Sequence, residues 1–135
     1  MLQPKKTKHK KEQRGRMKGN SKGGTEIAYG DYALQALGRS WVNGRQIEAA
    51  RQAIARYTKR RGKLWLGIFP HKPVTEKGSE VTRGSGKGPV KEYVAVVKPG
   101  RIIFEIGGLP EDIAKEALRR GAQKFPLKTR IISKK

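Results

Sequence analysis

The stretch that decides the fold reads NGRQIEAARQAIARYTKRRG (residues 43–62), KLWLGIFP (63–70) and HKPVTEKGSEVTRGSGKGPVK (71–91). Asn43 is a suitable N-cap, and Gln46 stands three residues later, where a capping box places a glutamine. The residues that follow this cap predict a helix over 44–61. Gly62 is expected to end the helix in a left-handed conformation. A strand and a long loop are expected to follow this helix directly.

The predicted helix has opposed apolar and basic faces. At about 100° per residue from Arg45, one face collects the apolar residues Ile47, Ala50, Ile54 and Tyr57. The opposite face collects Arg45, Gln52, Arg56 and Lys59. Glu48 is the only acid in the helix, so the ion pairs of an ordinary solvated helix are largely missing. This imbalance favours contact with a polyanion over a merely solvated face.

The next two segments differ in their apolar content. Residues 63–69 are apolar on both faces, which predicts a central strand. Residues 70–91 form a 22-residue loop rich in Gly, Pro and basic residues. A loop of this length in a compact domain is usually functional or disordered.

The rest of the chain predicts an α+β fold. Short strands are expected within 25–41, and residues 93–97 and 102–106 flank a turn that predicts a β-hairpin. Pro110 is expected to be the first residue of a second helix that extends to about residue 125, and a final strand covers 127–133. The fold class is therefore α+β, with two helices packed on a mainly antiparallel sheet.

Charge is distributed unevenly along the 135 residues, whose formal net charge is +21. Residues 1–24 carry +8, 42–63 carry +6 and 70–91 carry +3. We expect residues 1–24 to be a basic extension, disordered until it meets a partner, and 25–135 to be one domain. Positive charge concentrated in the basic extension, one helix and one loop predicts a nucleic-acid partner. The chain has no cysteine, secretory signal or apolar run long enough to span a membrane.

The glycines at 84–88 invite comparison with phosphate-binding loops. The Walker spacing fails because Val81 occupies the first glycine position, and Gly88-Pro89 follows Lys87 where a helix should begin. Backbone N–H groups near Arg83 and Lys87 could still contact phosphate or ribose without catalysis. No catalytic set is suggested by spacing, and His9 and His71 are too far apart to predict a metal site. We therefore expect neither an enzyme nor a cofactor.

Six collinear blocks carry a resemblance to a known family. They are MLQPKKTK (1–8), RGRMKG (14–19), RQIEAAR (45–51), FPHKPVT (69–75), GKG (86–88) and VAVVKPGR (94–101). In these blocks the chain resembles large-subunit ribosomal protein sixteen of bacteria and organelles. It departs from the family pattern at His71, where an aspartate is usual, and at Arg83, which precedes Gly84 without an intervening methionine.

The resemblance implies an α/β-hammerhead-like fold bound to large-subunit ribosomal RNA (rRNA), beside neighbouring large-subunit proteins. The implied rRNA contacts are Lys5, Lys6, Lys8, Lys10, Lys11, Arg14, Arg16, Lys18, Arg45, Arg51, Arg56, Lys59, Arg60 and Arg61. The implied loop tip, facing transfer RNA (tRNA) in the A and P sites near the peptidyl transferase centre, is Arg83, Gly84, Gly86, Lys87 and Gly88. The implied location is a cytoplasmic or organellar ribosome, with no membrane partner and no homo-oligomer.

Two other functions remain open at this point. A free-standing RNA chaperone or nucleoid-type DNA-binding protein would share the charge, but it needs no long ordered loop. A phosphate-loop enzyme would turn over nucleotide in a reaction sensitive to Lys87.

Overall fold

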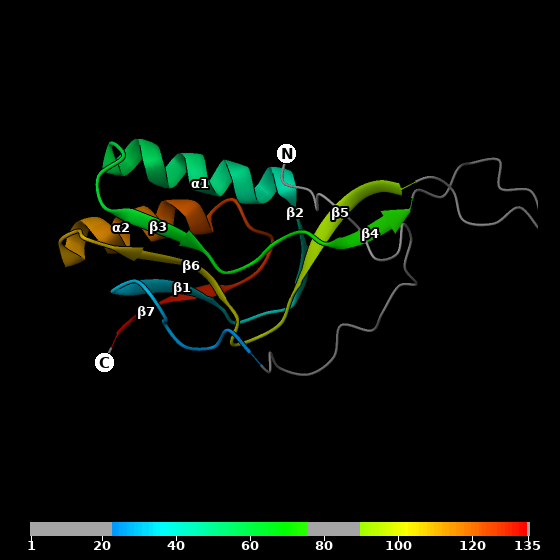
Figure 1. The fold of residues 1–135 in the computed structure, drawn as a ribbon, viewed down its shortest axis with the longest axis horizontal. Helices are drawn as coiled ribbons and strands as arrows, with labels where there is room; N and C mark the ends of the chain where they lie inside the picture. The colour runs from blue at the N-terminus through cyan, green and yellow to red at the C-terminus, as the bar shows by residue number, and fades with distance from the viewer. Residues whose placement is uncertain (1–22, 76–89, 135) are drawn as a thin grey trace, which may run out of the picture.

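The computed structural model describes residues 23–75 and 90–134. The elements in these ranges are β1 (Tyr32–Ala36), β2 (Ser40–Asn43), α1 (Gly44–Thr58), β3 (Lys63–Leu66), β4 (Lys72–Thr75), β5 (Val90–Val97), β6 (Ile102–Gly107), α2 (Glu111–Ala122) and β7 (Thr129–Ser133). The strands form two antiparallel sheets, with strand orders β3-β6-β1-β7 and β2-β5-β4 (Figure 1). The predicted α+β class with two helices is confirmed. Within the described ranges, neither helix has the length and apolar character needed to cross a bilayer.

The hairpin predicted from residues 93–97 and 102–106 is wrong, because β5 and β6 lie in different sheets. Each strand has only two edges: β5 pairs with β2 and β4, whereas β6 pairs with β1 and β3. The turn between them forms as expected, since the Arg101 N–H donates to the Lys98 carbonyl over 3.2 Å. Ala36 then bonds to Gly100 and Arg101 through its backbone, so the β1–β2 connection lies where the hairpin would have closed.

Two further boundaries correct the sequence-based prediction. β3 is an edge strand rather than a central one, since it pairs with β6 alone, and Leu66 is 41% exposed. The expected loop over 70–91 is partly ordered into strands, because β4 and β5 pair across its two ends. The predicted loop tip lies outside the described residues, as does almost all of the basic extension.

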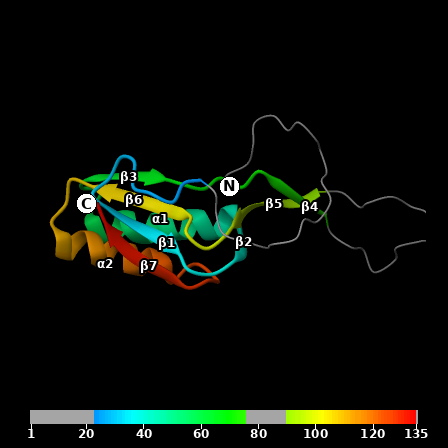
Figure 2. The same ribbon diagram turned by 90° about the horizontal axis from the view of Figure 1, so that it is seen from below.

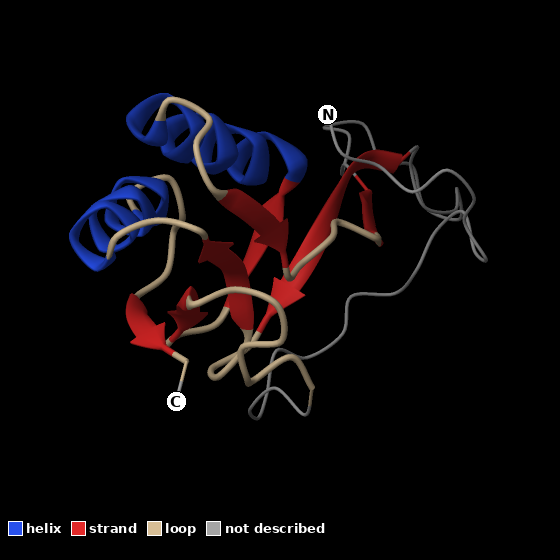
Figure 3. Ribbon diagram, turned by 60° about the vertical axis from the view of Figure 1, so that its left-hand side comes forward, coloured by secondary structure: helices blue, strands red, loops and turns tan. Residues whose placement is uncertain are grey.

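The helices pack side by side on one face of the four-stranded sheet (Figure 3). Ile47 and Ile54 of α1 share one core with Phe104 of β6 and Leu118 of α2. Gly121 permits the close approach, since a Cβ there would lie 2.7 Å from the Ile54 Cδ1 atom. The second helix is shorter than expected, and Pro110 caps it rather than forming its first turn.

The segment 23–31 lies on the other face of the four-stranded sheet, opposite the helices (Figure 2). The buried Glu105 of β6 attaches it, because its Oε1 atom accepts the N–H groups of Ala28, Tyr29 and Gly30 at 3.1, 2.7 and 2.8 Å. Burial alone would raise the pKa of Glu105. The three N–H donors and the charge of Lys134 outweigh it and hold the pKa below its usual value. The sheet is thus covered on both faces.

Candidate nucleic-acid interface

The start of α1 sets the orientation of every side chain on it. Asn43 Oδ1 accepts the Gln46 N–H at 2.9 Å, and Gln46 Oε1 accepts the Asn43 N–H at 3.0 Å. This reciprocal pair confirms the predicted capping box. Asn43 is also the last residue of β2, so the helix begins directly from a sheet strand. With Ile47 and Ile54 fixed in the core, the opposite face of α1 must point to solvent.

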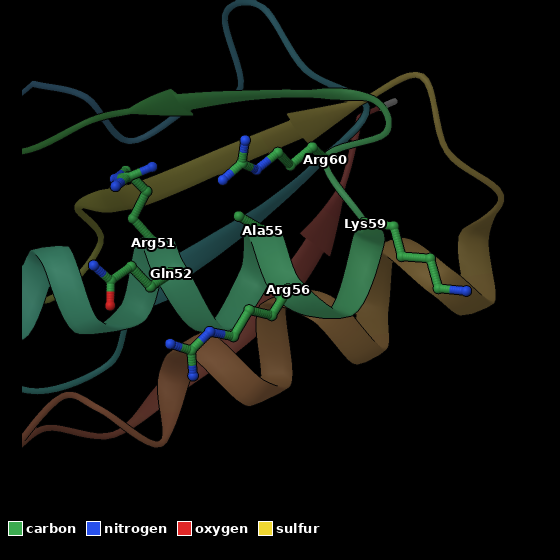
Figure 4. Close-up of a pocket in the computed structure, with 6 residues that line it drawn as sticks. All are labelled: Arg51, Gln52, Ala55, Arg56, Lys59 and Arg60. Carbon is green, nitrogen blue, oxygen red and sulfur yellow. The ribbon is translucent and has the colours of Figure 1, made fainter.

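A shallow hollow of about 760 Å³ lies along this outer face (Figure 4). We call the residues that line it the α1 basic surface, namely Arg51, Gln52, Ala55, Arg56, Lys59 and Arg60. The short side chain of Ala55 lies between longer cationic ones, as Figure 4 shows. A concave strip bordered by guanidinium and ammonium groups matches the shape and charge of a nucleic-acid backbone.

The three arginines of the α1 basic surface point in two directions. Arg51 and Arg60 extend toward β3, where they line a second hollow together with Leu64 and Leu66 (Figure 4). Arg56 extends the other way, toward α2, and lines a third hollow of about 520 Å³ with Arg120. The surface therefore offers positive charge over a width greater than that of a single helix.

The end of α1 differs from the sequence-based prediction. The helix stops at Thr58 rather than residue 61, and Lys59 and Arg60 adopt left-handed conformations with φ of 53° and 62°. Gly62 also has positive φ, at 72°, so its predicted conformation is confirmed although it does not cap the helix. A left-handed conformation costs a residue other than glycine roughly 1–2 kcal/mol. These two strained residues lie where the chain leaves α1 and directs Arg60 toward β3.

Arg51 differs from the other cations of the α1 basic surface because it forms an ion pair. Its guanidinium bonds both carboxylate oxygens of Glu48, with Nε at 3.1 Å from Oε2. The hydrogen bond from Arg51 is the main reason that the pKa of Glu48 is lowered. In contrast, no carboxylate within 23–75 and 90–134 forms an ion pair with Arg56, Lys59 or Arg60. Those three charges are uncompensated by the described part of the protein.

The second helix has the opposite character. Glu116 pairs with both Arg119 and Arg120, and Glu111 pairs with Lys115. The Arg120 guanidinium also lies 4.3 Å from the centre of the Tyr57 ring, in cation–π contact across the two helices. The cations of α2 are therefore largely matched by acids and aromatic rings of the same protein.

The structure places six of the predicted rRNA contacts, and all six lie on α1 or in the turn after it. Arg45, Arg56, Lys59, Arg60 and Arg61 are exposed, whereas Arg51 is half-buried. The predicted contacts between residues 5 and 18, and the loop residues 83–88, lie outside the described ranges. His71 is exposed, and no group of metal-binding side chains occurs among the described residues.

Sequence reasoning missed two residues that attach the end of the basic extension and the segment after it to the rest of the fold. Arg101 donates through Nη2 and Nε to the Gly67 carbonyl at 2.6 and 3.2 Å, and through Nη1 to the Gly23 carbonyl at 3.1 Å. It thereby attaches the end of the basic extension to the chain after β3. Glu105 attaches residues 28–30 in a similar way. An acid within the otherwise apolar run 102–106 was the available signal for Glu105; no comparable signal marked Arg101.

A small α+β fold with an uncompensated basic strip along one helix is typical of nucleic-acid-binding proteins. Comparison with known proteins narrows this class: the chain belongs to the ribosomal protein L16p/L10e family, which matches residues 4–132. It is 58% identical over 132 residues to "Large ribosomal subunit protein uL16" of Trichodesmium erythraeum (strain IMS101), over 98% of this chain and 96% of that relative. The family resemblance and the expectation of a non-enzymatic protein are both confirmed.

Proposed function

We propose that this protein is a constituent of the large subunit of a cytoplasmic ribosome and binds large-subunit rRNA through the α1 basic surface and the N-terminal extension. Neighbouring large-subunit proteins would be its other partners. The printed name of the cyanobacterial relative, at 58% identity over nearly the whole chain, supports the assembly. The mechanism is neutralisation of backbone phosphates with release of counterions.

The contrast between the two helices carries this proposal. Both present cations to solvent, but those of α2 pair with Glu111 and Glu116, whereas Arg56, Lys59 and Arg60 have no acidic partner in the described ranges. A protein that needed charge only for solubility would have no reason to concentrate its unpaired cations on one surface. A polyanion seated on α1 supplies the missing counter-charge.

A competition experiment separates this function from that of a general nucleic-acid-binding protein. Labelled, deproteinised large-subunit rRNA is bound to the protein at fixed salt, and either unlabelled rRNA or duplex DNA of matched phosphate concentration is added. The proposal expects rRNA to compete much better than DNA. Equal competition by the two would favour the RNA-chaperone or DNA-compacting alternative.

We further propose that the loop beyond β4 and β5, with its predicted tip at Arg83, Gly84, Gly86, Lys87 and Gly88, faces tRNA in the A and P sites. Its two ends are fixed by the β4–β5 pairing, which leads away from the helices. Deletion of residues 78–88 should leave incorporation into large subunits largely intact while weakening tRNA binding to those subunits. Loss of incorporation would contradict this division between helix and loop.

A further inference from the structure

Two aromatic rings stack on the sheet face opposite the α1 basic surface. The centroids of the Tyr29 and Trp65 rings lie 6.0 Å apart, and their planes differ by 22°. Trp65 is half-buried, but Tyr29 is 70% exposed, the largest exposed fraction among the large apolar or aromatic side chains of the described residues. Trp65 therefore lies beside the Tyr29 ring in an offset, nearly parallel arrangement, and most of Tyr29 is open to solvent.

The backbone beneath Tyr29 is held rigidly. The Tyr29 N–H donates to the buried Glu105 carboxylate at 2.7 Å, as its two neighbours do. Gly30 packs directly on β6, since a Cβ there would lie 2.8 Å from the Ile106 carbonyl oxygen, and the Asp31 N–H donates to that same oxygen at 2.8 Å. A buried carboxylate and a tightly packed glycine thus fix the backbone that carries an aromatic side chain with little part in the core.

Trp65 is held by the four-stranded sheet. It lies opposite Glu105 in the β3–β6 register, and its ring rests on Gly107, where an added Cβ would lie 3.3 Å from Cζ3. The Lys63 ammonium lies 5.8 Å from the centre of the Trp65 ring and adds a cation beside the stack. The nearby Asp31 carboxylate accepts the Gly108 N–H at 3.3 Å.

We propose that Tyr29 and Trp65 form a stacking site for one unpaired nucleobase of RNA, with Lys63 contacting an adjoining phosphate. This inference rests on the proposed function, and it adds a second contact of a different kind on a separate face. A flat, exposed ring on a fixed backbone, beside a second ring and a cation, fits a base because every base has a π-face that can stack on it. The net charge of +21 also favours a polyanion over an apolar protein partner at this position.

The test compares Tyr29→Ala with Tyr29→Phe in the full-length chain, after each is shown by thermal unfolding to be folded. The probe is deproteinised large-subunit rRNA over a range of salt concentrations. Loss of one stacked base should weaken affinity by about 5- to 100-fold at every salt concentration. The salt slope should stay unchanged because no phosphate contact is removed. Tyr29→Phe, which keeps the ring, should bind within about twofold of the unsubstituted protein.

A second measurement uses the unsubstituted protein, so it does not depend on how any variant folds. A twelve-nucleotide oligoadenylate should bind more tightly than its abasic analogue, which has the same phosphates and no bases to stack. Equal affinity for the two probes would overturn the proposal. Unchanged rRNA affinity in Tyr29→Ala would also overturn the proposal. The same holds if Tyr29→Ala keeps its rRNA affinity but loses binding to another large-subunit protein. Failure of the proposed function would look different, since the unsubstituted protein would then show no preference for rRNA over DNA.

Discussion

Replacing the three cations of the α1 basic surface that form no ion pair with the described residues should remove a defined part of the RNA affinity. In Arg56→Gln/Lys59→Gln/Arg60→Gln, each glutamine retains a long polar side chain but loses the charge. All three residues are exposed and outside the core, so the fold should persist. Arg51 is left in place because Glu48 already balances its charge.

The magnitude follows from counterion release. Each phosphate contact contributes a slope of about −0.7 to −0.9 to the logarithm of the affinity against the logarithm of the salt concentration. Three lost contacts should make the slope less negative by about 2.1 to 2.7, and at 0.1 M salt they should weaken binding by roughly 100- to 500-fold. These values assume that each of the three side chains meets one phosphate.

Filter binding of labelled large-subunit rRNA between 0.1 and 0.5 M salt, about the range in which such slopes are linear, measures both quantities. The matched control is Arg39→Gln/Lys115→Gln/Lys128→Gln, which removes the same charge from exposed positions outside the α1 basic surface. Its slope should stay close to that of the unsubstituted protein. Equal slopes in the two triple variants would refute the reasoning, because net charge rather than its location would then determine binding.

Three further predictions concern the folding that positions these surfaces, and urea unfolding measures each. Glu105→Gln should lower the free energy of unfolding by about 1–3 kcal/mol at pH 7, because three N–H groups, of which that of Gly30 is buried, lose a charged acceptor. Because the pKa of Glu105 is lowered in the folded state, its carboxylate stabilises the fold fully above the ordinary pKa of 4.5, and this stabilisation is lost as the pH falls through the pKa of the folded state. A difference in unfolding free energy between Glu105→Gln and the unsubstituted protein that did not change with pH would contradict this prediction. Gly121→Ala should cost about 1–3 kcal/mol by forcing its Cβ onto Ile54, and an unchanged midpoint would show that the helices can separate freely. Asn43→Ala should cost about 1 kcal/mol through loss of the capping box, whereas Asn43→Ser, which preserves an N-cap acceptor, should cost less.

The features that the sequence predicted correctly are those specified by neighbouring residues. The capping box at Asn43 and Gln46, the buried face of α1 and the exposed basic face all follow from spacings of three or four residues. The turn at Lys98–Arg101 is equally local, and it forms. Local spacing therefore predicted the part of the α1 basic surface that lies on the helix itself.

The features that were missed depend on contacts between distant parts of the chain. Whether β5 pairs with β6 depends on which strands already occupy their edges, and periodicity carries no such information. The left-handed turn at Lys59 and Arg60 ends α1 early because the chain must return to pair β3 with β6. Glu105 is more than 70 positions from the N–H groups that it binds, so its role is visible only in three dimensions.

Sedimentation through a high-salt gradient tests the central claim, membership of the large subunit, most directly. Tagged protein is expressed in cells, ribosomal particles are separated under dissociating conditions, and the tag is followed across the fractions. We expect the tag to sediment with large subunits at about one copy per particle, as for a specific interface rather than scattered phosphate contacts. Recovery at the top of the gradient, or with small subunits or nucleoid DNA, would contradict it.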